Sequence, residues 1–389
     1  MRRIVIWLIV LLSASMVVQS LQPKLAADPG YSTADIPNPP QNPVRLIFIH
    51  HSTGENWLAD ENGGLGIALR DNNYFVSDTN YGWGPDTIGD TTDIGHWWLW
   101  FRGPDSTIYM NALYAEGEQH SSYSRMDTAP AGENEIIMFK SCFPNSALRG
   151  RPSDPVPAIE NNPLKGQDSG SEYHKVGNAK GIYIDLLEYF ATRQDKLFIV
   201  VTAPPLNDPT FSNNARALNL WLIHDWLRGY PYRNVFVFDF YNVLTTNGGD
   251  PNTNDLDQET GNHHRWWNNA IQHKFDGDDD DNPNVTEYPT SSEDEHPSRA
   301  GNLKATAEFL PLLDFAYNRW KSIETTTTTI ASETTAPRTA TEATVVESET
   351  KTTLPPPAPA GFPIETVAVA GVLVAAIVAA AALYFRRRT

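Results

Sequence analysis

The chain has 389 residues, of which 40% are hydrophobic and 20% are charged. This composition supplies enough apolar material for a folded core and excludes a wholly disordered or collagen-like chain. Acidic residues outnumber basic residues by 47 to 29, and the resulting net charge of −18 argues against a nucleic-acid partner. Because Cys142 is the single cysteine, no disulfide can form within the chain.

Both ends of the chain carry apolar segments that do not belong to a domain. Residues 1–27 begin with a basic start followed by an apolar stretch, which is typical of a secretory signal peptide; an uncleaved membrane anchor is the alternative. Residues 366–385 are uncharged and mostly apolar, and the basic end at 386–389 follows at once. This pattern predicts a single transmembrane helix with its basic flank in the cytoplasm. We therefore expect a membrane-anchored protein whose folded part faces the outside of the cell.

Residues 322–361 are rich in Thr, Ser and Pro, which predicts an extended stalk without a core. The stalk, the apolar span and the basic end together resemble the C-terminal sorting tails of archaeal surface proteins. That resemblance implies that the span could be cleaved and replaced by a lipid. The remaining part, residues 44–321, has about 280 residues and suits one large domain.

Continuously apolar runs in this domain predict strands that are buried on both faces. They lie at residues 45–49, 135–139, 196–201 and 234–238, with a weaker run at 74–76. Helices are expected between and after them, at residues 178–193, 213–227 and 298–321. The alternation predicts an α/β fold, a three-layer α/β/α sandwich around a parallel sheet of about five strands in a flavodoxin-like arrangement. Sites in such sheets lie beyond the carboxyl ends of the strands.

Polar and glycine residues occupy the predicted strand ends. Ser52 follows the first strand, Gly82 and Gly84 follow the second, and Asn145 follows the third. His296 stands in an acidic segment just before the last helix. Singly, these residues are more often a helix cap, turn residues and part of an acidic loop.

In this order, the residues resemble the pattern of the SGNH or GDSL-like hydrolases, and the sharpest match is the acid-x-His-Pro sequence that contains His296. The resemblance covers most of the domain and implies a serine esterase with a Ser-His-Asp triad. It makes Ser52 the nucleophile and His296 the base, and it forms the oxyanion hole from Ser52, Gly84 and Asn145. The chain departs from the family pattern in reading His-His-Ser instead of Gly-Asp-Ser, and Cys-Phe-Pro-Asn-Ser instead of Gly-x-Asn-Asp.

These residue types also suit the chemistry. A serine hydroxyl becomes a good nucleophile when an imidazole takes its proton, and a carboxylate orients that imidazole. For the carboxylate we favour Asp294, because its residue type matches, although Glu293 occupies the usual position three residues before His296. Gly82 is the alternative to Gly84.

We considered Cys142 as a thiol nucleophile and expect instead a small buried apolar residue. His50 and His51 are adjacent and should project in opposite directions, so no shared zinc site is expected and no cofactor is required. Residues 276–287 place oxygen side chains at positions 1, 3, 5, 7, 9 and 12, as in an EF-hand calcium loop. They predict either a structural calcium site or a solvated acidic loop.

Two aromatic segments, residues 96–101 and 263–267, either stack on sugars or pack in the core. Together with the expected export, the acidity and the lack of a long apolar lid, they favour acyl (acetyl) esters on carbohydrate as the substrate. The alternative is a non-catalytic glycan-binding protein on a degenerate hydrolase scaffold, in which Ser52 is inert.

Overall fold

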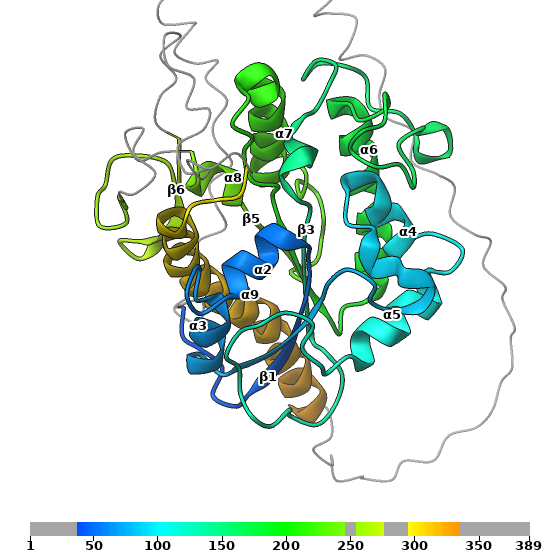
Figure 1. Ribbon diagram of the computed structural model, residues 1–389. Coiled ribbons are helices and arrows are strands. Elements are labelled where there is room, and N and C mark those ends of the chain that lie inside the picture. Colours follow the sequence, from blue (N-terminus) through cyan, green and yellow to red (C-terminus); the bar gives the residue numbers. More distant parts are fainter. Residues whose placement is uncertain (1–36, 246–253, 276–294, 334–389) are drawn as a thin grey trace, which may run out of the picture. The chain divides into compact units, whose positions relative to one another are not determined.

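A five-stranded parallel sheet forms the middle layer of the fold (Figure 1). The computed structural model describes residues 37–245, 254–275 and 295–333. The strands are β1 (Val44–Ile49), β2 (Tyr74–Thr79), β3 (Ile136–Lys140), β4 (Leu197–Val201) and β5 (Val235–Phe238), in the order β2-β1-β3-β4-β5. All five lie where the apolar runs predicted them, and the predicted three-layer sandwich is confirmed.

Helices cover both faces of the sheet, because alternate residues of each buried strand point to opposite sides. Phe48 and Met138 belong to one core cluster, whereas Ile47 and Ile137 belong to the other. The first face is covered by α2 (Ser52–Leu58), α3 (Leu65–Asp71), α8 (Phe240–Val243) and α9 (Arg299–Glu333). The second face is covered by α4 (Trp97–Phe101), α5 (Ser106–Ala115), α6 (Val176–Thr192) and α7 (Ser212–His224).

The two aromatic segments are structural. The first forms α4, whose Trp97 and Trp100 are fully buried against the second face of the sheet. The second forms β6 (His263–Trp267), which pairs in antiparallel fashion with β7 (Ala270–Lys274). Trp97 and Trp100 therefore pack in the core, and the partly exposed Trp98 and Trp266 also pack against the two core clusters.

The hairpin was not expected, although the sequence contains a signal for it. Asn268 and Asn269 form the two-residue turn, both with positive φ angles of 51° and 63°. Two such residues are what a type I′ turn requires. The hairpin packs on α9, where the rings of Trp266 and Phe315 lie 5.5 Å apart.

Three predicted features lie outside the described residues, namely the signal peptide at 1–27, the acidic loop at 276–287 within the domain, and the span at 366–385. Helix α9 continues past Lys321 to Glu333, so the predicted stalk at 322–361 begins with helix. Within the three described ranges, no helix combines the length and the apolar character needed to cross a membrane.

Asp314 of α9 is a buried carboxyl group, with 4% of its surface exposed. The Tyr74 hydroxyl donates a hydrogen bond to Asp314 Oδ1 over 2.8 Å. Burial raises the pKa of Asp314 to about 6, which outweighs the opposite effect of this hydrogen bond. Because the pKa of an unfolded aspartate is about 3.9, the stability that the protonated group contributes is lost as the pH rises from about 4 to about 6.

Asp314→Asn should keep an acceptor for Tyr74 and remove this titration. The stability of the variant relative to the unaltered protein should therefore rise by about 3 kcal/mol between pH 4 and pH 7. Urea unfolding at several pH values in this range, followed by tryptophan fluorescence, measures the difference. A difference that does not change with pH would show that Asp314 keeps an ordinary pKa in the folded protein.

Candidate functional site

Ser52 lies at the start of α2, directly beyond the carboxyl end of β1. The connection is tight: the Gly54 N–H donates to His51 O over 2.7 Å, and a Cβ atom on Gly54 would lie 2.4 Å from that of His50. Only glycine allows the helix to begin this close to the strand. The Ser52 N–H belongs to the first turn, where N–H groups have no acceptor within the helix, and its side chain is partly exposed.

The two histidines before Ser52 are held by different partners. His50 Nε2 lies 3.1 Å from Asp78 Oδ2 at the end of β2. His51 Nε2 contacts Gly89 O, and its Nδ1 lies 3.0 Å from Thr92 Oγ1. Burial lowers the pKa of His51 despite the opposing effect of the Gly89 carbonyl, so this ring is neutral at pH 7. In the described part of the chain, no group of three or more His, Cys, Asp or Glu side chains is arranged to hold a metal ion.

A series of polar contacts connects Ser52 with a buried lysine at the end of β3. Ser52 Oγ lies 3.5 Å from Cys142 Sγ, and Thr53 Oγ1 lies 3.3 Å from the same sulfur. Lys140 is fully buried, and its Nζ donates to Thr53 Oγ1. Cys142 is partly exposed. The expected buried apolar role for Cys142 was therefore wrong, because two hydroxyl groups and an ammonium surround its thiol.

These neighbours change the acidity of the thiol. Burial acts to raise the pKa of Cys142, but the Lys140 ammonium and the hydrogen bonds from Ser52 and Thr53 outweigh it and hold the pKa below its ordinary value. Burial also lowers the pKa of Lys140, with Cys142 acting in the opposite direction. The thiol beside Ser52 is therefore more acidic than an ordinary cysteine thiol.

The predicted oxyanion donor Asn145 lies in the turn after β3 and is 1% exposed. Its Oδ1 accepts the Ile94 N–H over 2.8 Å. Its Nδ2 donates to Asp93 Oδ1 and, over 3.3 Å, to Cys142 O. The amide therefore links two loops, and it would have to give up one of these bonds in order to bind an oxyanion.

Gly82 and Gly84 lie in the loop after β2, with φ angles of 75° and 79° that favour glycine. The Gly82 N–H donates to Asp90 Oδ1 over 2.7 Å. Since that donor is already bound, Gly84 is the better candidate of the two for the oxyanion hole. Tyr81, in the same loop, stacks on the ring of His51, the residue before Ser52.

His296 lies at the same edge of the sheet as Ser52. Its ring meets the Phe143 ring edge to face at 5.3 Å. Phe143 follows Cys142, whose sulfur contacts Ser52. The structure thus brings the predicted nucleophile and the predicted base to two neighbouring residues of the β3 loop.

The acid that would complete a triad is not placed, because Glu293 and Asp294 lie outside the described residues. Their neighbour Glu295 accepts the backbone N–H of Asn207 through Oε2. This contact holds the segment before His296 against the loop that follows β4.

Helix α9 fixes the position of His296 relative to Ser52. Ser298 Oγ accepts the Gly301 N–H over 3.1 Å, so Ser298 caps α9. Further along α9, Thr306 Oγ1 accepts the indole N–H of Trp57 over 2.9 Å and donates to Gly63 O over 2.7 Å. Because Trp57 belongs to α2, these bonds join the helix that begins at Ser52 to the helix that begins after His296.

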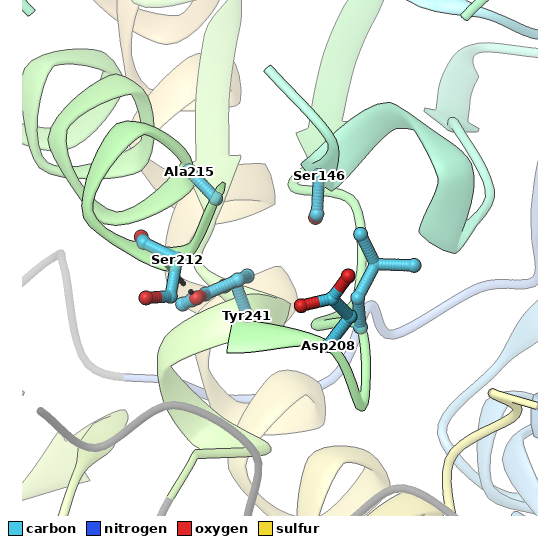
Figure 2. Close-up of a pocket in the computed structure, with 6 residues that line it drawn as sticks. Ser146, Asp208, Ser212, Ala215 and Tyr241 are labelled. Carbon is cyan, nitrogen blue, oxygen red and sulfur yellow. Dashed lines mark hydrogen bonds between the residues drawn. The ribbon is translucent and has the colours of Figure 1, made fainter. Parts of the chain in front are cut away.

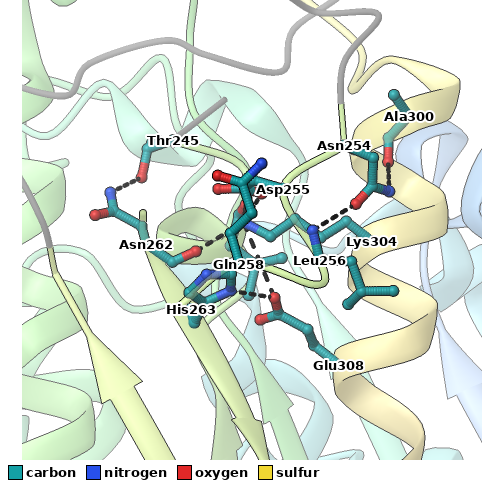
Figure 3. Close-up of polar contacts among 12 residues, drawn as sticks. Thr245, Asn254, Asp255, Leu256, Gln258, Asn262, His263, Ala300, Lys304 and Glu308 are labelled. Carbon is teal, nitrogen blue, oxygen red and sulfur yellow. Dashed lines mark hydrogen bonds and ion pairs between the residues drawn. The ribbon is translucent and has the colours of Figure 1, made fainter. Parts of the chain in front are cut away.

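A buried ionic network lies behind the start of α9 (Figure 3). Lys304 is fully buried, and its ammonium donates to Asn262 O over 2.7 Å and to Val243 O over 3.1 Å. It also pairs with Asp255 Oδ1 at 2.8 Å and lies 3.9 Å from Glu308 Oε1. One ammonium thereby holds three separate segments against α9.

Glu308 extends this network into the hairpin. Its Oε1 lies 2.6 Å from His263 Nδ1, and its Oε2 accepts the His264 N–H over 2.9 Å. The first strand of the hairpin is therefore bound to α9 through a buried carboxylate. We infer that the network helps to set where α9 begins, and with it the place of His296.

A second acid–histidine pair, which sequence reasoning missed, lies at the end of β5. Asp239 Oδ2 is 2.9 Å from His273 Nε2, and both side chains are almost fully buried. The nearby hydroxyl of Thr202 donates to Asp239 Oδ1 over 3.1 Å and not to the histidine. The Thr202 hydroxyl therefore serves the carboxylate of this pair, and we assign the pair a structural role.

A narrow hollow opens on the same edge of the sheet, over β3 to β5 (Figure 2). It holds about 160 Å³ of empty space, part of it open to solvent, and is lined by Ser146, Leu206, Asp208, Ser212, Ala215 and Tyr241. Neither Ser52 nor His296 lines this hollow. We therefore assign it no part in the chemistry.

The acidity of Cys142 can be measured directly, because it is the only cysteine in the chain. Alkylation by iodoacetamide should have its pH midpoint below that of the same chain in urea, where the thiol pKa is about 8.5. Ser52→Ala and Thr53→Val should each move the midpoint of the folded protein upward, because each removes a hydrogen bond to the thiolate. Equal midpoints for folded and unfolded chains would contradict the electrostatic argument.

Lys304→Met should destabilise the protein by about 3 to 5 kcal/mol, because it leaves two buried carboxylates without their ammonium partner. Lys321→Met is the matched control on the same helix. Lys321 pairs with Glu135 at 2.9 Å, but both side chains are partly exposed, so its loss should cost about 1 kcal/mol or less. Chemical denaturation measures both values, and equal small losses would show that the network contributes little.

No family model, curated protein or solved structure matches this chain. The function of the site therefore has to be inferred from its own residues, distances and charges.

Proposed function

We propose that the chain is a serine esterase of the SGNH type, anchored at the cell surface, that hydrolyses acyl esters on carbohydrate. One observation carries the proposal: Ser52 and His296 contact adjacent residues of the β3 loop at the carboxyl edge of a parallel sheet. Sites of α/β folds of this kind lie at that edge. The residue order that resembles the SGNH hydrolases adds independent support.

In the proposed reaction, Ser52 Oγ attacks the ester carbonyl carbon while His296 accepts its proton. The tetrahedral intermediate collapses, the alcohol oxygen leaves with the proton from His296, and an acyl-enzyme is formed. Water then attacks the acyl-enzyme and gives a proton to His296, which returns it to Ser52 as the carboxylic acid is released. Asp294 would orient the imidazole.

The negative charge on the tetrahedral oxygen needs fixed donors. The N–H groups of Ser52 and Gly84 fit this role, because one lies in the first turn of a helix and the other in an exposed loop. Asn145 would join them only if its amide turned away from Asp93 or from Cys142 O.

The second candidate is a glycan-binding protein on a degenerate hydrolase scaffold. One observation favours it: both sides of the Asn145 amide are already hydrogen-bonded within the protein. A fluorophosphonate probe separates the two functions, because it labels only an activated serine. Labelling of Ser52 would support the esterase, and an unlabelled folded protein would favour the binding function.

Ser52→Ala and His296→Ala should each lower the hydrolysis of acetylated sugars by about 1,000-fold or more, and the double variant should be little worse than either. This non-additivity is expected because the two residues act as one unit. Asp294→Asn should cost more than Glu293→Gln if Asp294 is the third member. Hydrolysis at an undiminished rate by a folded Ser52→Ala protein would overturn the proposal.

A further inference from the structure

Tyr81 is the most exposed large hydrophobic side chain in the described residues, with 63% of its surface accessible. Its ring stacks on His51, with centroids 3.9 Å apart and an angle of 23° between the planes. One face of the ring is therefore covered by a buried imidazole, which leaves the other face open to solvent. An open, flat, partly apolar face is a surface on which another ring can stack.

The backbone around Tyr81 is held firmly. The Tyr81 N–H donates to Asn80 Oδ1 over 2.9 Å, and the next N–H in the chain, that of Gly82, is bound by Asp90. Asn80 Nδ2 in turn donates to Glu55 Oε2 of α2 over 3.2 Å. Because the ring is already held in place, little conformational entropy would be lost when a ligand binds to it.

The ring also lies near the proposed nucleophile, because it stacks on His51, the residue that directly precedes Ser52. A molecule stacked on the open face would therefore lie in the neighbourhood of Ser52. The rigid ring of Tyr81, and not a flexible side chain, would then set the distance between the ester carbonyl carbon and Ser52 Oγ.

The charge around Tyr81 limits what can stack there. Burial raises the pKa of Tyr81, and the nearby carboxylates of Asp90 and Asp93 act in the same direction. The same negative charges would repel an anionic ligand. A neutral ring with an apolar face suits these surroundings.

We propose that Tyr81 is the platform on which a neutral sugar ring stacks, so that an acyl ester on that ring is presented to Ser52. This inference rests on the proposed function and names the part of the substrate that the site recognises. Trp97 and Trp100, which are fully buried, have no part in it.

The experiment compares Tyr81→Ala with Tyr81→Phe, which keeps the ring and removes the hydroxyl. An acetylated neutral methyl glycoside is the test substrate, and glycerol triacetate is the acyclic control ester. Tyr81→Ala should raise KM for the glycoside about 5- to 10-fold and leave KM for glycerol triacetate unchanged. Tyr81→Phe should change both by less than about twofold, because the stacking face is kept.

Tyr232→Ala is the matched control variant. Tyr232 is 41% exposed and precedes β5, at the opposite edge of the sheet, so its loss should change neither KM. An acetylated uronate glycoside should be a poorer substrate than the neutral glycoside. Unchanged KM values in Tyr81→Ala, equal losses in Tyr81→Phe, or equal use of the uronate would overturn the proposal.

A binding measurement separates this inference from the proposed function. On a Ser52→Ala background, calorimetric titration with the acetylated glycoside should show weaker binding when Tyr81→Ala is added. If Ser52→Ala retains hydrolysis, the esterase proposal fails while the binding result still tests the platform. If Ser52→Ala is inactive and binding does not depend on Tyr81, only the platform fails.

Discussion

The packing of Trp57 against α9 is the interaction on which the geometry of the site depends. Trp57 is fully buried, stacks on Phe240 with centroids 4.7 Å apart, and bonds through its indole N–H to Thr306. Its own helix begins at Ser52, and the helix that it contacts begins just after His296. Two residues that are far apart in the chain are therefore held in one arrangement by a single aromatic side chain and the groups around it.

Much of this arrangement is visible in the amino-acid sequence. Parallel strands buried on both faces must be apolar throughout, so all five were found from their apolar runs. The start of α9 at Arg299 also lies within one residue of the helix predicted at 298–321. Segment 96–101 gave no helical signal, because an almost uniformly apolar segment shows no hydrophobic periodicity. The hairpin was hidden because its strands are short and contain His, Arg and Gln.

The chemistry of the site was less accessible. Lys140 ends an apolar strand, which is an unusual place for a charge, but its contact with Thr53 depends on how helix α2 lies against the end of β3. The same is true of Cys142, whose neighbours come from α2 and β3. Side-chain contacts between helices and strands decide whether a group acts as an acid, as a hydrogen-bond donor or only as packing. The amino-acid sequence contains little information about these contacts. Asn145 illustrates the point, since a residue type suited to an oxyanion hole is bound to two loops instead.

The position of Cys142 affects how inhibition of this protein by thiol reagents should be interpreted. Cys142 Sγ lies 3.5 Å from Ser52 Oγ. Any group attached to this sulfur would therefore occupy the space through which a substrate reaches Ser52 Oγ. Thiol-directed reagents would therefore block a reaction carried out by the serine, simply by occupying the space in front of it. Sensitivity to such reagents would look like the signature of a cysteine enzyme, and replacing the thiol with a smaller, unreactive side chain is what would distinguish obstruction from participation.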